Sequence, residues 1–482
     1  MYLLQAKNQN EEYILHKNGN IKLVIDIVNE TSNDLYQSQL HYNICKNIAR
    51  SRVSTLDLQK ILENIYALKS KSVRKATAII AYVQRCDNDI LNIKVNGTTK
   101  NILRNFSNTK LNYIGHKPEE HNYIELEYVK LLLIKALIHK LYRFCSKKYF
   151  LKNTGKSILR AWVDVSAELY PNEIRSSSVL IYPFALNFVR QFRFILWCHQ
   201  AKINFSLYGL SYSLYTIFSK IINRTPNDIL IAEIEFKANS SHSKELANAN
   251  FSKIYTSDEF EVASFVLYRD LVACGAEIVN SAHGVGNYCA HIEYSLFRAI
   301  TSSQINFYKI NNPNIKYNLL CSKMRTIKGL NHYKFSLNKD AAIVLIHQPF
   351  DESGLIAEHN ALHLLHIELE RVAKALSIHY VVKLHPNTKK NFFLKNNQYF
   401  NITNTWSDIA FLRPIFITIN STVFFDTRGL GPIIVYSPPT FDPSLYYSPP
   451  FTTFALSETE KLIKSLVSIP NWLSASAMHA VL

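Results

Sequence analysis

Three short apolar runs decide the fold: AAIVLIHQP at residues 341–349, HYVVKLHP at 379–386 and PIFITIN at 414–420. Between the first two, a helical spacing marks the core face of one long helix, with Leu362, Leu365, Leu369, Val372 and Leu376 on that face. PIIVYS at 432–437 adds a further strand. Short apolar strands joined by helices predict a parallel sheet that is covered on both faces. We therefore expect an α/β domain over residues 336–460.

A second alternation of strands and helices precedes this domain. Its apolar runs are VLIYPF at 179–184, INFSLYG at 203–209, DILIAEIEF at 228–236, EIVNSAHG at 277–284 and YNLLCS at 317–322. Helices are expected at 186–201 and 257–273. This pattern predicts another α/β domain over residues 121–335. Residues 1–120 form an N-terminal extension to which no motif assigns a role, and residues 461–482 form a C-terminal helix or tail.

Composition and charge narrow the class of protein. The chain has 482 residues, of which 48% are hydrophobic, so it can bury two cores. Its net charge of +17 calls for an anionic partner: nucleic acid, a membrane surface or a phosphorylated substrate. Nucleic acid is disfavoured, because zinc-finger spacing, an RNA-binding aromatic signature and a clear helix-turn-helix pattern are all missing.

The sequence also indicates where the protein works. Seven scattered cysteines without a CxxC pair are typical of reduced thiols in a cytosolic protein. The first residues do not resemble a secretory signal, and charges interrupt the longest apolar stretch, at 179–198. We expect a cytoplasmic protein without a transmembrane helix, placed peripherally on the inner face of a bacterial inner membrane.

The membrane expectation comes from a basic, amphipathic segment. Residues 129–163 hold nine Lys or Arg and no Asp or Glu. On a helix, one face would carry Ile134, Leu137, Ile138, Leu141 and Phe144, and the opposite face Lys135, His139, Arg143 and Lys147. Such a helix can lie on an anionic bilayer. The alternative is a helix whose apolar face packs in the core and whose charged face is solvated.

Candidate ligand-binding residues follow the strands of the C-terminal domain, because ligands of open α/β sheets lie at the carboxyl ends of strands. Lys383, His385 and Pro386 follow one strand, and the imidazole could donate to a phosphate oxygen. The segment Asn420 to Asp426 follows another strand, and its Ser421 and Thr422 are good helix caps at a site that suits phosphate. A structural strand end and ordinary capping are the alternatives.

Candidate catalytic residues lie in two further loops. His283 follows a strand of the first domain and could be a base, with Gly284, Gly286, Asn287 and Asp258 lining a crevice for the acceptor. A core histidine is the alternative, and Thr256 and Glu259 near Asp258 have capping-box spacing.

The adjacent carboxylates Asp351 and Glu352 could raise one another's pKa as a base requires, or belong to a solvated turn. His359, His363 and His366 fit a helix surface better than a metal site, since no carboxylate or thiolate partner accompanies them.

In combination, the His-Pro pair at 385–386 and the Ser-Thr pair about 35 residues later are more specific than either alone. Residues 175–450 resemble bacterial glycosyltransferases of the GT-B type, with two facing Rossmann-like domains, that use cytidine nucleotides. Among them are sialyltransferases, with HP and S-S/T motifs, and Kdo transferases of capsule and lipopolysaccharide. The segment Ser421 to Asp426 and the pair His283-Gly284 are also similar to motifs of CDP-glycerol glycerophosphotransferases.

The resemblance implies roles for the candidate residues. Lys383, His385, Ser421 and Thr422 would hold the phosphate of a CMP-sugar, and the acceptor would be a glycan or lipid-linked hydroxyl. The base would be Asp351 or Glu352 by likeness to the sialyltransferases, although Ser353 interrupts their acidic motif, or His283 by likeness to the glycerophosphotransferases. Because a CMP-sugar carries a single phosphate, no metal or other cofactor is expected.

Two rival functions are carried forward. One is transfer of a polyol phosphate from a CDP-glycerol-type donor, a different reaction that would leave phosphorus in the product. The other is a membrane- or nucleic-acid-binding protein without catalysis, built on the basic segment.

Overall fold

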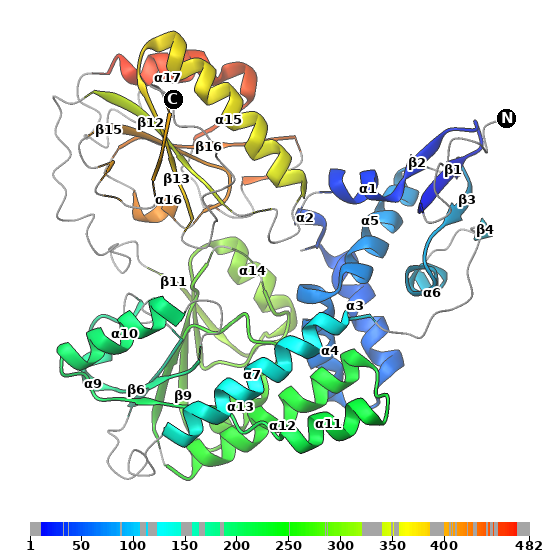
Figure 1. Ribbon diagram of the computed structural model, residues 1–482, viewed down its shortest axis with the longest axis vertical. Coiled ribbons are helices and arrows are strands. Elements are labelled where there is room, and N and C mark those ends of the chain that lie inside the picture. The colour runs from blue at the N-terminus through cyan, green and yellow to red at the C-terminus, as the bar shows by residue number, and fades with distance from the viewer. Residues whose placement is uncertain are drawn as a thin grey trace.

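The structure is a computed structural model that places three sheets along the chain (Figure 1). It describes residues 11–469 except 32, 37, 87–88, 107–111, 114–122, 146–156, 163–168, 184–187, 250, 285, 287, 321–339, 349, 351–355, 386–399, 404–405, 407, 410–411, 422, 428–430, 440–441, 444–446 and 448–451. Two of the sheets are parallel and belong to the two Rossmann-like domains, and the third belongs to an N-terminal extension. The predicted α/β class with two such domains is therefore confirmed.

The C-terminal domain contains a parallel sheet of order β14-β13-β12-β15-β16-β17. Its central strand β12 is buried along its whole length, as its apolar run predicts. Helix α15 buries Leu362, Leu365, Leu369 and Val372 against the sheet, which confirms the predicted core face. The elements are β12 (Ala341–Ile346), α15 (Ile356–Leu376), β13 (His379–Lys383), β14 (Phe400–Thr403), β15 (Arg413–Thr418), α16 (Val423–Asp426), β16 (Ile433–Tyr436), β17 (Thr452–Phe454), η7 (Leu456–Glu458) and α17 (Thr459–Val467).

The first Rossmann-like domain contains a parallel sheet of order β11-β10-β9-β8-β5-β6-β7. Helices cover it on both sides, and α7 crosses the domain on the side that faces the viewer (Figure 1). The elements are α7 (Leu126–Cys145), β5 (Ser157–Ala161), α9 (Glu173–Ser176), β6 (Ser178–Ile181), α10 (Phe188–Gln200), β7 (Phe205–Leu207), α11 (Leu214–Ile222), α12 (Asn227–Ala247), β8 (Lys253–Thr256), α13 (Ser264–Ala273), β9 (Glu277–Ser281), β10 (Leu296–Ala299), α14 (Ser302–Asn311) and β11 (Lys316–Leu319).

Two local predictions for this domain are wrong. The apolar run 228–236 belongs to the long helix α12 and not to a strand, and it buries residues on several sides of that helix, including Leu230, Ile231 and Ile234. The helix expected at 257–273 begins only at Ser264, because residues 257–263 form a loop after β8. That loop holds carboxylates that belong to the candidate site.

The N-terminal extension combines a small sheet of order β2-β1-β3-β4 with helices that contact both domains. Its α4 packs against α12 of the first domain, and its α1 touches α15 of the C-terminal domain (Figure 1). The elements are β1 (Tyr13–His16), β2 (Ile21–Leu23), α1 (Val24–Glu30), α2 (Asn33–Tyr36), α3 (Gln39–Arg52), α4 (Leu56–Lys69), α5 (Lys71–Arg85), β3 (Ile90–Lys94), α6 (Gly97–Phe106) and β4 (Asn112–Tyr113).

Buried polar contacts fix the extension to the first domain. The guanidinium of Arg52 donates from Nε and Nη2 to the carboxylate of Asp228, both at 3.2 Å, and the Tyr66 hydroxyl donates to the same carboxylate at 2.6 Å. Asp228 is fully buried, so this ion pair lies within the interface.

On its other side the extension borders a crevice of about 1160 Å³ against the C-terminal domain, beside Tyr436 and Ala455. None of the predicted site residues lines this crevice. In the described part of the chain, no helix combines the length and the apolar character that crossing a membrane requires.

Candidate active site

The order of strands in each sheet marks where ligands should be sought. In the first domain the strand order reverses at β5: β6 and β7 follow on one side of it, and β8 to β11 on the other. In the C-terminal domain the same reversal occurs at β12, between β13 and β15. Ligands of open α/β sheets bind at such reversals, at the carboxyl ends of the strands. The loop after β8 adjoins the reversal in the first domain, with the loop after β9 beside it, and the loops after β12, β13 and β15 adjoin the reversal in the C-terminal domain. These loops are the candidate walls.

In the first domain, these loops bring a histidine and a buried carboxylate together. His283 follows β9, and Glu259 follows the neighbouring strand β8. The Glu259 Oε1 accepts a hydrogen bond from the His283 backbone N–H at 2.8 Å and another from its Nδ1 at 2.7 Å. Asn280 donates to Oε2 of Glu259 at 3.2 Å. Glu259 is fully buried, whereas the side chain of His283 is 30% exposed.

This pairing lowers the pKa of Glu259 and fixes the tautomer of His283. Burial would raise the pKa of Glu259, but the neighbouring His283 and the hydrogen bonds that it donates lower the pKa below its usual value. The carboxylate is therefore ionised at neutral pH and can only accept hydrogen bonds. The proton of the imidazole must then sit on Nδ1, so that Nε2 is the basic nitrogen. A histidine held in this way is suited to remove a proton from an acceptor hydroxyl.

The glycine loop after His283 is held by side chains that were not singled out in the sequence. Gln304, in the first turn of α14, donates from Nε2 to the carbonyls of Gly284 at 2.7 Å and Gly286 at 3.0 Å. The Tyr288 ring stacks on the His283 imidazole with 5.0 Å between ring centroids. A Cβ on Gly284 would lie 2.5 Å from the Tyr288 hydroxyl, so this glycine makes room for the stacking tyrosine. Asn287 lies outside the described residues.

Asp258, which was expected to face the acceptor, is fully buried. Its carboxylate accepts from the Arg160 guanidinium and from the Tyr268 hydroxyl, both at 2.5 Å, and from the Tyr294 hydroxyl at 3.2 Å. The structure therefore places it in a polar network beneath the loop after β8. Its neighbour Glu259 carries the contact to His283. The capping-box spacing of Thr256 and Glu259 obscured this, since no helix begins at that point.

In the C-terminal domain, the end of β13 carries two basic groups. Lys383 is buried, with its Nζ donating to the carbonyl of Leu384 at 3.0 Å and lying 5.1 Å from the centre of the Trp406 ring. Burial lowers the pKa of this ammonium to about 8. His385 is half-buried, and burial together with the positive charges of Lys383 and Arg190 lowers its pKa to about 4.

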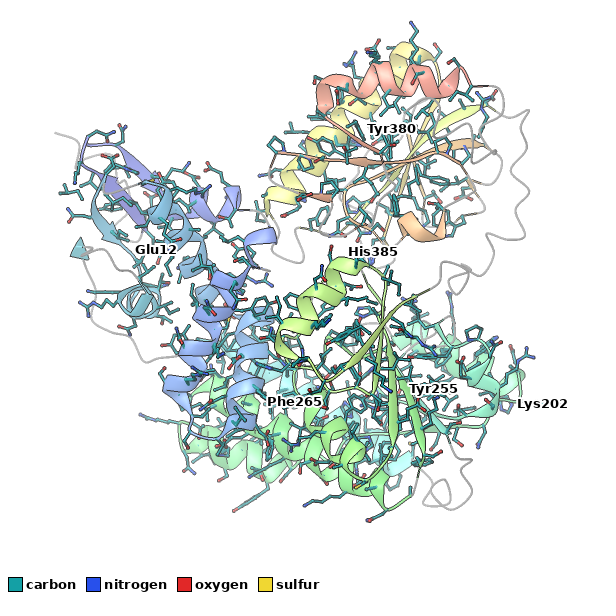
Figure 2. All side chains as sticks on the ribbon, turned by 180° about the vertical axis from the view of Figure 1, so that it is seen from behind. Glu12, Lys202, Tyr255, Phe265, Tyr380 and His385 are labelled. Atoms are coloured by element: carbon teal, nitrogen blue, oxygen red, sulfur yellow. The ribbon has the colours of Figure 1, made fainter. Side chains whose placement is uncertain are left out.

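Arg190, whose positive charge contributes to the lowered pKa of His385, belongs to α10 of the first domain. Figure 2 shows His385 at the edge of the C-terminal domain that faces α14. The first turn of α14 also holds the loop that follows His283, through Gln304. His385 therefore lies on the side of the C-terminal domain that faces the first domain.

The end of β15 supplies polar groups beside the reversal at β12. Ser421 is buried, and its Oγ accepts from Gln348 Nε2 at 2.8 Å and from the Val423 backbone N–H at 3.2 Å. The Tyr447 hydroxyl accepts from the Ser421 N–H at 2.6 Å. The bond from the Val423 N–H is a local turn contact of Ser421 just before α16. Helix α16 has only four residues, so its dipole is weak.

Several predicted residues cannot be placed. Asp351, Glu352, Pro386 and Thr422 lie outside the described residues, and so does the side chain of Asp426. Asn420 is half-buried, two residues after the end of β15. Of the three histidines on α15, His366 bonds through Nδ1 to the Tyr380 hydroxyl at 2.8 Å. Within the described part of the chain, no three His, Cys, Asp or Glu side chains converge as metal ligands would.

Comparisons with known proteins give likenesses of structure only. No family model matches the chain, and no curated protein does. Matching solved structures include the glycotransferase of kitacinnamycin, at 9% identity over 67% of this chain and 92% of that one, with a TM-score of 0.37. MnaA of S. aureus, solved with UDP, matches at 10% identity over 65% and 88%, with a TM-score of 0.40. MurG of Acinetobacter baumannii matches at 7% identity over 65% and 90%, with a TM-score of 0.39. At these values nothing about activity is drawn from them.

Proposed function

We propose that the chain is a glycosyltransferase that moves a sugar of the sialic acid or Kdo type from a CMP-activated donor to a hydroxyl of a surface glycan. The observation that carries the proposal is the His283–Glu259 pair at the carboxyl edge of the first sheet. A partly exposed imidazole whose Nδ1–H bonds a buried carboxylate is a base prepared for a hydroxyl proton. The acceptor is a capsule or lipopolysaccharide glycan or its lipid-linked precursor, at the inner face of the bacterial inner membrane.

The donor half of the site rests on the basic groups of β13. Lys383 and Arg190 bring positive charge beside the His385 imidazole, and burial together with these two charges lowers the pKa of the imidazole. An anion bound there would relieve this repulsion and raise the pKa of both Lys383 and His385. The preference for cytidine rests on the His-Pro and Ser-Thr motifs, so UDP is the competitor against which it must be tested.

The reaction then follows from these positions. Nε2 of His283 takes the proton of the acceptor hydroxyl, and the acceptor oxygen forms a bond to the anomeric carbon of the sugar. The bond between that carbon and the phosphate oxygen breaks, and CMP leaves with the electron pair. Glu259 stabilises the imidazolium that results, and the cations near β13 stabilise the charge on the leaving phosphate. No step requires a metal.

Transfer of polyol phosphate from a CDP-glycerol-type donor is the second candidate, and one observation favours it. The base suggested by that resemblance is the histidine of the His-Gly pair, which here has a carboxylate partner. In this reaction the acceptor oxygen would attack phosphorus, and CMP would leave from a CDP donor. The product would therefore contain phosphorus.

The test is turnover with CMP-sugar and CDP-glycerol donors, followed by mass analysis of the product. A product without phosphorus supports the first proposal, and one with phosphorus supports the second. His283→Ala is expected to lose activity by about a hundredfold or more while still binding nucleotide. The control is His363→Ala, an exposed histidine on α15. Full activity in His283→Ala would contradict both reactions as drawn.

A further inference from the structure

Helix α7 lies on the first domain in the orientation opposite to the one that its amphipathic pattern suggests. Its buried residues are Val129, Leu132, Ala136 and His139. The predicted apolar face points to solvent: Phe144 is 92% exposed and Leu141 is 65% exposed. The interpretation of α7 as a helix with a packed apolar face and a solvated charged face is therefore wrong.

The basic face of α7 is fixed against the protein by acidic partners. Lys135 Nζ bonds to Glu235 at 2.9 Å and to Glu261 at 3.3 Å. Arg143 pairs with Glu245 at 2.9 Å.

A neutral contact reinforces this orientation of α7. His139 Nδ1 accepts from the Leu210 backbone N–H at 2.8 Å, and burial, followed by nearby positive charges, lowers the pKa of this imidazole to about 2. These contacts prevent the helix from rotating to bury its apolar side chains.

Two neighbouring helices extend the exposed apolar surface. The Tyr142 hydroxyl of α7 donates to Gln191 Oε1 of α10 at 2.7 Å, and α7 also contacts α11. Figure 1 shows α7 lying between these two helices on the first domain. We call this surface the α7 face. Its exposed large apolar residues are Leu131, Ile134, Leu137, Leu141 and Phe144 of α7, Val189, Phe192 and Leu196 of α10, and Tyr215, Phe218, Ile221 and Ile222 of α11.

The charges around the α7 face are positive. Neither α10 nor α11 contains an Asp or Glu, and α7 has only Glu127, in its first turn. Exposed cations lie among the apolar residues, at Lys130 and Lys140 of α7 and Arg193 of α10. A face that is apolar and cationic suits an anionic bilayer, where side chains enter the acyl boundary and cations meet the headgroups. A second copy fits less well, because a two-fold contact would bring the same cations together.

We propose that the α7 face binds an anionic lipid bilayer, with α7 lying in the plane of the interface. Three neighbouring helices contribute exposed large apolar side chains to this face, and extended apolar surfaces mark interaction sites. The inference does not depend on the donor or on the reaction. It would place the first domain, which is proposed to receive the acceptor, against the surface where a lipid-linked acceptor resides.

The test is co-sedimentation of the full-length protein with vesicles of phosphatidylcholine alone or with about a third of phosphatidylglycerol. Wild type is expected to bind the anionic vesicles and to be released by high salt. The double variant Leu141→Ser, Phe144→Ser is expected to lose roughly tenfold or more in partitioning, because two large side chains no longer enter the bilayer. The matched control is Leu364→Ser, Ile367→Ser, two exposed apolar residues on α15 of the other domain.

A second pair of changes tests the charge contribution. Lys140→Glu with Arg193→Glu is expected to abolish the preference for anionic over neutral vesicles. Absence of wild-type binding to anionic vesicles, or equal binding by the Leu141/Phe144 variant, would overturn the proposal. If the wild-type protein is a dimer in the absence of lipid and the Leu141/Phe144 variant is a monomer, the α7 face binds a second copy of the chain and not a bilayer, which overturns the proposal. The thermal stabilisation of the variant by CMP is measured in parallel. If it is retained, the nucleotide site is intact, and a failure of the membrane proposal does not count against the proposed catalytic function.

Discussion

Lys383→Met should make the protein more stable and at the same time unable to bind its donor. The ammonium of Lys383 is buried, and its pKa is lowered from 10.5 to about 8 because burial penalises the charged form. The charged ammonium therefore lowers the free energy of unfolding, and a bound anionic ligand would offset this destabilisation. Methionine has nearly the same shape and carries no charge, so the substitution removes the destabilisation and the anion site together.

The expected gain in stability follows from the lowered pKa of Lys383. A difference of about 2.5 pKa units corresponds to about 3 kcal/mol of destabilisation at pH 7, where the ammonium is protonated in both states. The substitution also removes the hydrogen bond from Nζ to the Leu384 carbonyl and the contact with the Trp406 ring. Their loss destabilises the protein by about 1–2 kcal/mol. We therefore expect a net gain of about 1–2 kcal/mol at pH 7.

The pH dependence has a definite sign. Between pH 8 and 10.5 the unfolded chain holds a proton on Lys383 that the folded chain has released, so the stability of wild type rises with pH across this window. Lys383→Met should lack that rise.

The assay is urea denaturation at pH 7 and pH 10, with CMP-induced thermal shift as the binding readout. The control is Lys374→Met, a half-exposed lysine on α15 paired with Glu370, which should change stability by less than about 0.5 kcal/mol. A destabilised Lys383→Met with the wild-type pH slope would refute the reasoning.

Three further predictions concern the other parts of the molecule. Glu259→Gln should lower kcat by about a hundredfold or more with nucleotide binding intact, since the amide no longer stabilises the imidazolium; steady-state kinetics beside nucleotide titration checks this. Gly284→Ala should impair turnover, because its Cβ would meet the Tyr288 hydroxyl, and Tyr288→Phe in the same chain should restore part of it. Arg52→Ala should destabilise the protein by about 3–5 kcal/mol in urea denaturation, because it leaves the Asp228 carboxylate buried without its cation.

Local patterns predict the fold best where a single pattern decides the structure. The strand β12 is apolar on both faces and is buried on both, and α15 follows its apolar spacing. The run 228–236 misleads because α12 is buried on several sides, and periodicity cannot distinguish such a helix from a buried strand.

The site and the orientation of α7 depend on contacts that no local pattern contains. The Glu259 carboxylate meets His283 because β8 and β9 are neighbours in the sheet, although the residues are 24 positions apart. The basic face of α7 is turned inward by Glu235, Glu245 and Glu261, which follow it by about a hundred residues. An amphipathic pattern shows that a helix has two faces. The partners determine which face is buried.

The central claim is that the C-terminal domain holds a cytidine nucleotide at the end of β13, and calorimetric titration of CMP against UDP tests it most directly. Wild type should bind CMP more tightly than UDP, His385→Ala should lose that binding, and His379→Ala, at the opposite end of the same strand, should retain it. Equal binding of CMP by wild type and His385→Ala, or tighter binding of UDP, would contradict the assignment.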